Sequence, residues 1–302
     1  MADVVGVSPR TVSRVVNDEG GFSSETRERV LEVIRELNYH PNVHARSLIS
    51  GRSGSIGFVA PVLSDPFFPE LAEGVQRAAH AAGLTVLLSM SDHDEGRQHD
   101  VLASLEGHRL DGIIVFPIGD LAGLNPFLER GVNLVPVDTM VRHRHARSVL
   151  SDLEGGTVAA IERLLGRGCR HLAMINASEE PPERRRRRDA FVQAVPGEVP
   201  HLVIDVTWTM EGGRRAADRI IDDHPDVDGI FAYNDVMALG AMQTIQRRGL
   251  RIPEDIAVIG CDDIMFASGV TPSLTTIRID RAQLGFESVR SIVELADGAT
   301  EL

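Results

Sequence analysis

Residues 3–17 have the sequence DVVGVSPRTVSRVVN, which predicts two short helices joined by a tight turn. Ser8 and Pro9 form a helix start, because a serine hydroxyl can accept hydrogen bonds from the exposed N–H groups of the first turn and proline suits the first helical position. The residues before Gly6 are expected to form the last turn of a preceding helix, and residues 17–21 are expected to end the second helix. The sequence therefore begins with the pattern helix, turn, helix.

A third helix is predicted to start at Ser23 or Ser24. Charged residues occupy one face of this helix, and apolar residues occupy the other, as expected for a helix that packs on one side only. The apolar residues of that face are Val30, Ile34 and Leu37. Together the three helices predict an all-α helix-turn-helix module, which we assign to residues 1–40.

This N-terminal module resembles the head of the lactose/galactose repressor family of bacterial transcriptional regulators. Residues 3–17 match the family pattern DVAxxAGVSxxTVSRVLN, and the match continues in NYHPN at 38–42 and in ARSL at 45–48. The resemblance implies that 45–48 belong to the hinge helix of the family, so residues 41–54 are expected to be hinge and linker. In the family the first helix begins several residues further upstream, which implies a truncated first helix here.

The resemblance also implies which residues contact DNA. The helix that starts at Ser8 would be the recognition helix, whose first residues reach base edges in the major groove. Arg10 would donate two hydrogen bonds to guanine O6 and N7, and Leu48 would be inserted between base steps in the minor groove. The alternative is that these residues form a solvated helix face with no role in DNA binding, and that Leu48 only packs on its own domain. The implied DNA-binding residues are Ser8, Pro9, Arg10, Thr11, Ser13, Arg14, Asn17, Asn42, Ala45 and Leu48.

From Ser55 onward, short apolar runs alternate with amphipathic helical stretches. The predicted strands cover residues 56–60, 85–88, 112–116, 132–137, 171–175, 229–232 and 256–259. Predicted helices between them include 70–82, 156–165, 213–223 and 236–246. Strands that alternate with helices indicate parallel sheets, so the body is predicted to be α/β with two doubly wound lobes.

The resemblance implies the same body, a two-lobed periplasmic-binding-protein-like core over residues 55–302. The N-lobe would take residues 55–150 and 279–302, and the C-lobe would take residues 151–278. The predicted fold class is therefore α/β, with an all-α helix-turn-helix head and a hinge helix before a core of doubly wound parallel sheets.

Polar residues follow three of the predicted strands, namely Asp138, Asn234 and Asp262. Ligands of open α/β lobes bind outside the carboxyl ends of the strands, so these side chains are expected to face one cleft. Carboxylates and amides suit the hydroxyl groups of a sugar. The alternative is that such residues cap the helices that follow, which we expect for Asp235 and consider for Asp152.

Further effector contacts are implied by the resemblance. Arg187 matches the arginine of the family motif RxxGF, with Ala190 in place of the glycine, although the arginine run 184–188 leaves the register open by one residue. Trp208 lies where some members place an aromatic wall. In the N-lobe, Asp65 stands where the family often has asparagine, and Phe67 is expected to wall the cleft. The predicted effector-binding residues are Asp65, Phe67, Asp138, Arg187, Trp208, Asn234 and Asp262.

Composition excludes several classes of protein. The chain has 302 residues, of which 43% are hydrophobic and 25% charged, so it is neither disordered nor a membrane bundle. No apolar run is long enough to span a membrane, and no secretory signal is visible. The net charge of −13 argues against nonspecific nucleic-acid coating. The cysteines, Cys169 and Cys261, are isolated and indicate a reducing compartment, so we expect the protein in the cytoplasm.

No phosphate-binding, dinucleotide-binding, hydrolase or zinc-protease motif occurs, so we expect no enzyme, no cofactor and no metal. The resemblance implies a ligand-responsive repressor that releases a palindromic operator when a sugar, a nucleoside or a related polar effector binds between the lobes. Its partners would be operator DNA and a second copy of the chain, with tetramer formation left open. When bound to the operator, the protein would be associated with the nucleoid. The alternative is a cytoplasmic sugar-binding module whose head is disabled by truncation.

Overall fold

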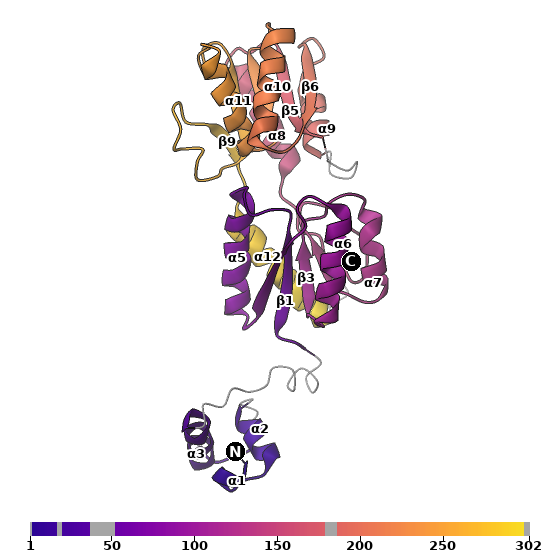
Figure 1. Cartoon of the computed structure of the whole chain (residues 1–302), viewed down its shortest axis with the longest axis vertical. Coiled ribbons are helices and arrows are strands. Elements are labelled where there is room, and N and C mark those ends of the chain that lie inside the picture. Colours follow the sequence, from indigo (N-terminus) through magenta and orange to yellow (C-terminus); the bar gives the residue numbers. More distant parts are fainter. Residues whose placement is uncertain (1, 17–19, 37–51, 179–185, 299–302) are drawn as a thin grey trace. The chain divides into compact units, whose positions relative to one another are not determined.

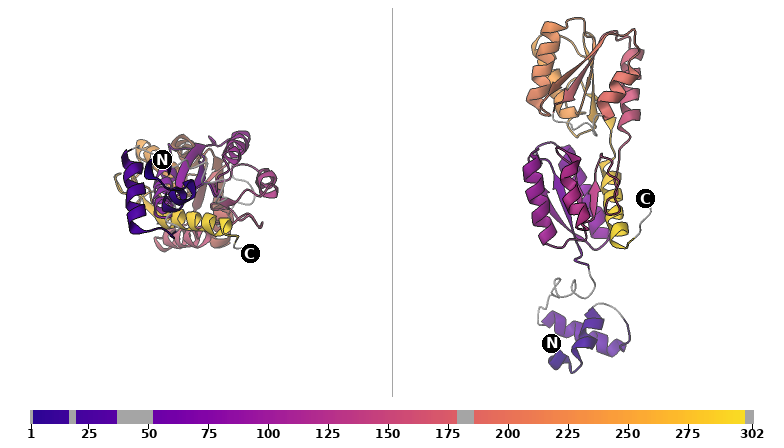
Figure 2. Two further views of the ribbon diagram at one scale, coloured as in Figure 1. Left: turned by 90° about the horizontal axis from the view of Figure 1, so that it is seen from below. Right: turned by 90° about the vertical axis from the view of Figure 1, so that its right-hand side faces the viewer.

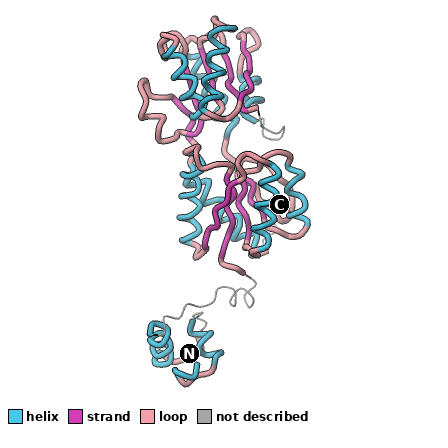
Figure 3. The backbone as a smooth tube through the Cα atoms, viewed as in Figure 1, coloured by secondary structure: helices cyan, strands magenta, loops and turns pink. Residues whose placement is uncertain are grey.

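The structure is a computed structural model that describes residues 2–16, 20–36, 52–178 and 186–298. Its contacts divide the chain into two compact units, Met1–Gly54 and Ser55–Leu302, which are described one at a time (Figure 1). The described residues of the first unit form helices and no strands, and the second unit contains two parallel sheets with helices on both faces (Figure 3).

The first unit contains helix α1 (Ala2–Val5), helix α2 (Pro9–Val16) and helix α3 (Ser24–Glu36). The Ser8 hydroxyl accepts a hydrogen bond from the amide of Thr11 at 3.1 Å, so the predicted cap of α2 is confirmed. Ser23 caps α3 in the same way, accepting from the amide of Thr26 at 3.1 Å. Gly6 ends α1 with a φ of +71°, a backbone conformation that suits glycine.

A small core holds these three helices together. Its buried residues are Val5, Val12, Val15 and Val30. Ile34 packs against this core as predicted, while Leu37 lies outside the described residues. Because Val12 and Val15 turn inward, α2 buries one face and leaves the opposite face to solvent.

The N-lobe of the second unit is built on a four-stranded parallel sheet. Its strands are β1 (Ser55–Ala60), β2 (Thr85–Met90), β3 (Gly112–Val115) and β4 (Leu134–Pro136), in the order β2-β1-β3-β4. Helices α5 (Phe67–Ala81) and α12 (Arg281–Ala296) pack on one face. Helix α6 (Glu95–Gly107), the 3₁₀ turn η1 (Leu121–Leu124) and helix α7 (Asn125–Glu129) cover the other (Figure 1).

The C-lobe repeats this design on a five-stranded parallel sheet. Its strands are β5 (Leu172–Ala177), β6 (His201–Val206), β7 (Gly229–Ala232), β8 (Ala257–Asp262) and β9 (Thr275–Arg278), in the order β6-β5-β7-β8-β9. Helices α10 (Met210–Asp223) and α11 (Asp235–Arg247) cover one face. Helices α8 (Leu153–Gly166) and α9 (Arg186–Ala194) cover the other (Figure 2).

The α/β fold class predicted from the sequence is confirmed, and each predicted strand corresponds to a strand of the structure. Two further strands, β6 and β9, are absent from the predicted set. Both lie at an edge of the C-lobe sheet, and their side chains are mostly exposed or half-buried. Strand β9 has one aliphatic residue and therefore no apolar run, whereas β6 contains the run 202–204 and could have been predicted, as the edge strand β2 was.

Two segments of the chain cross between the lobes. The first runs from β4 to α8, and the second runs from β9 to α12. The carboxyl ends of β4, β7 and β8 lie beside these crossing segments. The two crossings therefore bring strand ends from both sheets to one place, where a ligand site is expected in this architecture.

Candidate functional site

The outer face of α2 is polar and accessible. Ser8, Pro9, Arg10 and Ser13 are exposed, and Thr11 and Arg14 are half-buried. This is the face that a recognition helix needs, because its side chains can reach base edges while the valines of the same helix hold it to the head. The other predicted DNA-contacting residues, Asn17, Asn42, Ala45 and Leu48, lie outside the described residues, as does the predicted hinge helix.

A narrow cleft lies between the two lobes of the second unit. Its lining residues are Asp65, Phe67, Phe68, Phe116, Asp138, Arg187, Trp208, Tyr233, Asn234, Asp262 and Ile279. The structure brings together all seven residues that the sequence analysis singled out for the effector. The analysis missed three aromatic residues, Phe68, Phe116 and Tyr233. Phe116 and Tyr233 directly follow β3 and β7, so the strand-end rule that found Asp138 could also have found them.

The polar residues at the strand ends are held by the local backbone. Asp138 follows β4 with a φ of +53°, and Asp262 ends β8 with a φ of +123°. The carboxylate of Asp138 accepts a hydrogen bond at 2.7 Å from the amide of Ser151, which lies in the first crossing segment. Non-glycine residues with positive φ are uncommon, and such strained positions concentrate at functional sites.

Asn234 has two hydrogen-bonding roles. Its side-chain oxygen accepts from the amide of Met237 at 2.9 Å and so caps α11, while its amide nitrogen donates to the carboxylate of Asp65 at 3.3 Å. Asp65 belongs to the N-lobe, so this contact spans the cleft. The expectation that Asp235 caps this helix is wrong, because the residue before it has the extended backbone of a cap and Asp235 is already helical.

The carboxylate of Asp235 instead holds a neighbouring turn. It accepts from the hydroxyl of Thr276 at 2.6 Å and from the amide of Ile264 at 2.9 Å. Asp152, the other aspartate considered as a cap, accepts from the amide of Gly155 at 2.9 Å and does cap α8.

Arg187 supplies the positive charge of the cleft. Its side chain is buried, its guanidinium carbon lies 3.6 Å from the centroid of the Tyr233 ring, and it donates to the Tyr233 carbonyl. Neighbouring arginines point elsewhere, since Arg186 forms an ion pair with Glu154 and Arg188 lies 3.6 Å from Asp205. Among the described arginines of the run, Arg187 is the one that lines the cleft.

Burial alters the protonation of the acidic residues. Burial raises the pKa of Asp65, although its bond from the Phe67 amide and the charge of Arg187 oppose the rise. Burial also raises the pKa of Asp262 well above its usual value, against the attraction of Arg187. Burial likewise raises the pKa of Asp235 to about 7. A carboxyl group whose pKa is raised can donate as well as accept hydrogen bonds, which suits a ligand that carries hydroxyl groups.

Trp208 forms an aromatic wall that contacts both lobes. Its ring centroid lies 4.6 Å from that of His93 and 5.8 Å from that of Tyr233. The same side chain packs against the core of the N-lobe and the core of the C-lobe. The space left inside the cleft is only about 20 Å³, so a sugar can enter only if the lobes or these side chains move.

Sequence comparison assigns both units to known families. Residues 1–42 match the family described as bacterial regulatory proteins, lacI family, and residues 161–301 match the periplasmic binding protein-like domain. A ribose operon repressor from Halalkalibacterium halodurans is 35% identical over 293 residues, which cover 95% of this chain and 86% of that protein. The chain belongs to the lacI family of bacterial regulatory proteins. As a member it is a ligand-responsive transcriptional regulator with a DNA-binding head and an effector-binding core.

Solved structures of lacI-family proteins share this fold. The lac repressor dimer bound to operator and the anti-inducer ONPF has a TM-score of 0.87 and 27% identity, covering 98% of this chain and 91% of that one. The transcriptional regulator CelR in complex with cellobiose has a TM-score of 0.74 and 28% identity, covering 99% and 93%. The matched relatives are regulators of transcription.

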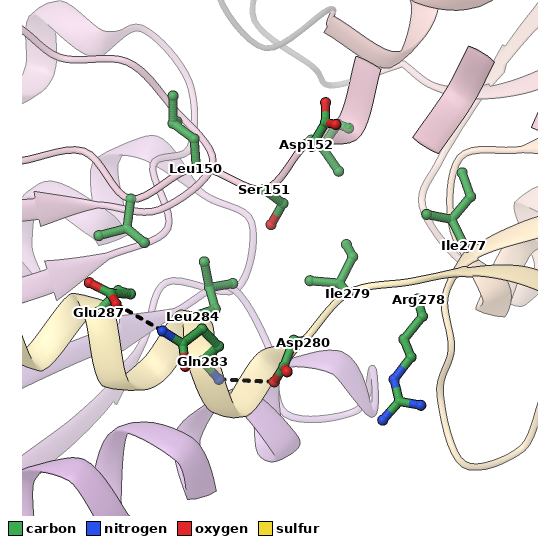
Figure 4. Close-up of a pocket in the computed structure, with 12 residues that line it drawn as sticks. Leu150, Ser151, Asp152, Ile277, Arg278, Ile279, Asp280, Gln283, Leu284 and Glu287 are labelled. Carbon is green, nitrogen blue, oxygen red and sulfur yellow. Dashed lines mark hydrogen bonds between the residues drawn. The ribbon is translucent and has the colours of Figure 1, made fainter. Parts of the chain in front are cut away.

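A second cavity of this lacI-family core lies beside the two crossing segments (Figure 4). It has a volume of about 250 Å³ and is lined by residues 149–153 and 277–280 together with Gln283, Leu284 and Glu287. Asp152 and Asp280 face it, but each uses a carboxylate oxygen to cap a helix. The narrower cleft is the better effector site, because charged and amide groups from both lobes converge there.

The described residues form neither a metal-binding cluster nor a membrane-spanning helix. They contain no group of three or more histidine, cysteine, aspartate or glutamate side chains placed to hold a metal ion. In the same part of the chain, no helix has the length and apolar character needed to cross a membrane.

Proposed function

We propose that this lacI-family regulator is a repressor that releases a palindromic operator when a sugar, a nucleoside or a related small polar effector binds between its lobes. The observation that carries the proposal is the convergence of acidic, amide, guanidinium and aromatic side chains from both lobes on one cleft. Domain boundaries follow: a head over 1–40, a hinge and linker over 41–54, and a core over 55–302.

The chemistry of the cleft supports a hydroxylated, uncharged effector. Hydroxyl groups can both donate and accept, so they suit carboxyl groups such as those of Asp138 and Asp262 as well as the amide of Asn234. Arg187 would donate to ring or hydroxyl oxygens, and Trp208 and Phe67 would cover the apolar C–H face of a sugar ring. Asp65 completes the proposed set from the N-lobe. The cellobiose complex of the related CelR and the name of the ribose repressor are consistent with a sugar.

The proposed DNA contacts lie on α2 and in the hinge. Arg10 would select guanine, Pro9 would make apolar contact, and Ser8, Thr11, Ser13 and Arg14 would reach phosphates or base edges. Asn17, Asn42, Ala45 and Leu48 would complete the interface, with Leu48 in the minor groove. A homodimer would present two heads to half-sites about 34 Å apart, the spacing of one helical turn.

Effector binding would act by shifting an equilibrium between lobe arrangements. The cleft of the closed core holds about 20 Å³, so the effector favours an arrangement in which it is wider. A ligand shifts such an equilibrium only by its differential affinity for the two states, typically about 1–3 kcal/mol. The protein acts by binding rather than by catalysis, needs no cofactor, and works in the cytoplasm, where its operator is.

The test begins with selection of DNA from a random duplex pool by the full chain. We expect enrichment of a near-palindrome, and fluorescence anisotropy should then show weaker binding when one member of a panel of D-ribose, cellobiose, other common sugars and nucleosides is added. Failure to enrich any sequence would reject the repressor and leave the sugar-binding module. Enrichment that no member of the panel affects would reject the proposed effector class. Sedimentation in the same buffers should show a dimer.

A further inference from the structure

The turn that follows β8 carries Asp262 and has an unusual backbone. Asp262 and Asp263 have φ values of +123° and +56°, which non-glycine residues rarely adopt. From the C-lobe side, the turn is held by two hydrogen bonds. The amide of Asp263 donates to the Thr276 hydroxyl at 3.2 Å, and the amide of Ile264 donates to the Asp235 carboxylate at 2.9 Å.

The same turn is held from the N-lobe by Arg281, the first residue of α12. Its guanidinium donates to the carbonyl of Asp262 and, at 2.9 Å, to the carbonyl of Asp263. One of its nitrogens also lies 2.7 Å from the carboxylate of Glu70 on α5. The Arg281 side chain is only 13% exposed, so its bonds are shielded from water and from salt.

Helices α5 and α12 are packed too closely to move independently at this point. A Cβ atom on Gly74 of α5 would lie 2.8 Å from the Arg281 carbonyl, and one on Gly285 of α12 would lie 2.6 Å from the backbone of Gly74. Only glycine permits such an approach. The guanidinium of Arg281 is thus attached to a rigid helix pair of the N-lobe, while the carbonyls that it binds lie at the end of β8 and in the turn that follows it in the C-lobe.

We propose that Arg281 and Glu70 are positioning residues that tie the Asp262 turn to α5, so that the effector-binding geometry of the C-lobe depends on the position of the N-lobe helices. The assignment of Asp262 to the effector rests on the proposed function. The tie itself rests on the contacts above. In these contacts Glu70 reaches the turn only through Arg281. A substitution of Glu70 should therefore alter the stability of the Asp262 turn on the other lobe.

Hydrogen–deuterium exchange of the full chain, read by mass spectrometry on peptides that span residues 260–276, tests the tie. Loss of charge-assisted hydrogen bonds should speed local opening, so we expect about tenfold faster exchange in R281M and about threefold in E70A. The matched controls are R290M, which removes a 54% exposed guanidinium of α12 that pairs with Glu287 and Glu294, and E73A, which changes an exposed glutamate of the same helix as Glu70. Neither control should change exchange of the turn.

Unchanged exchange in R281M, or an effect of E70A no larger than that of E73A, would overturn the proposal. Circular dichroism of E70A identifies any general loss of folding. In the exchange experiment, such a loss would speed exchange throughout α5 and the N-lobe sheet and not in the turn alone. Calorimetric titration with D-ribose and with cellobiose is a separate measurement. Absence of binding to the unsubstituted chain would count against those two sugars as effectors, and the exchange result would still decide the role of Arg281.

Discussion

Replacement of Asn234 by serine separates helix capping from effector binding. Serine caps a helix about as well as asparagine, so the bond from the Met237 amide should survive in N234S. The shorter side chain cannot reach Asp65, which removes the 3.3 Å contact across the cleft, and it cannot present an amide to an effector. We therefore expect little loss of stability and a clear loss of effector affinity.

The magnitudes follow from the contacts. The bond to Asp65 is long, so its loss should lower the free energy of unfolding by no more than about 1 kcal/mol. A buried effector group that loses its partner costs about 1–3 kcal/mol, which is about 5- to 150-fold in the dissociation constant. The matched control is D152A, which removes the cap of α8 outside the cleft and should cost about 1 kcal/mol of stability with no change in effector affinity.

Thermal unfolding followed by circular dichroism and calorimetric titration of the effector identified by the operator screen measure the two quantities. D152A should lower the midpoint temperature by about 2–4 °C, and N234S should lower it less. If N234S binds the effector as tightly as the unsubstituted chain, Asn234 is a cap alone and the proposed effector set is wrong at this position. If N234S loses as much stability as D152A while D152A also loses effector affinity, capping and binding cannot be separated as argued.

Three further predictions concern protonation, DNA and spectroscopy. Folded Asp235 keeps its proton up to about pH 7, whereas the unfolded group releases it near pH 3.8, so the free energy of unfolding should fall as pH rises between these values. In urea unfolding, D235N should reduce the slope of that fall by up to about 1.4 kcal/mol per pH unit, the value for one proton. An unchanged slope would refute the raised pKa. In fluorescence anisotropy, R10A should lose about 1–3 kcal/mol of its preference for the operator over other sequences and should keep its effector affinity. An equal loss of affinity for all DNA sequences would exclude a base contact. Trp208 is the only tryptophan of the sequence, and its ring contacts that of His93 at a tilt of 54°, so effector binding should shift its emission. A constant spectrum would contradict movement of the cleft wall.

Much of the fold could be predicted because buried parallel strands leave a strong signal. Strands β1, β5 and β7 are almost wholly buried, so each appears as a continuous apolar run that helices separate from the next. The edge strand β9 carries no such run, and its position depends on pairing with β8, which a single sequence does not encode locally. The edge strand β6 has a short apolar run at 202–204 that the predicted set omits.

The candidate site was predictable as a set of strand-end positions and not as a network. The rule that ligands bind beyond strand ends placed Asp138, Asn234 and Asp262 at one edge, and the structure brings them together. Which neighbour caps α11 depends on one residue of helix register, which is why Asp235 was assigned the wrong role. The contact between Arg281 and Glu70 joins segments that are distant in sequence, and no local sequence pattern predicts it.

The central claim is that effector binding in the cleft and operator binding by the head are thermodynamically coupled. The most direct test measures the dissociation constant of the effector by calorimetry with and without saturating operator DNA, and that of the operator with and without saturating effector. Linkage predicts that each ligand weakens the other by the same factor, about 5- to 150-fold. Identical effector affinity in the presence and absence of operator would contradict the account.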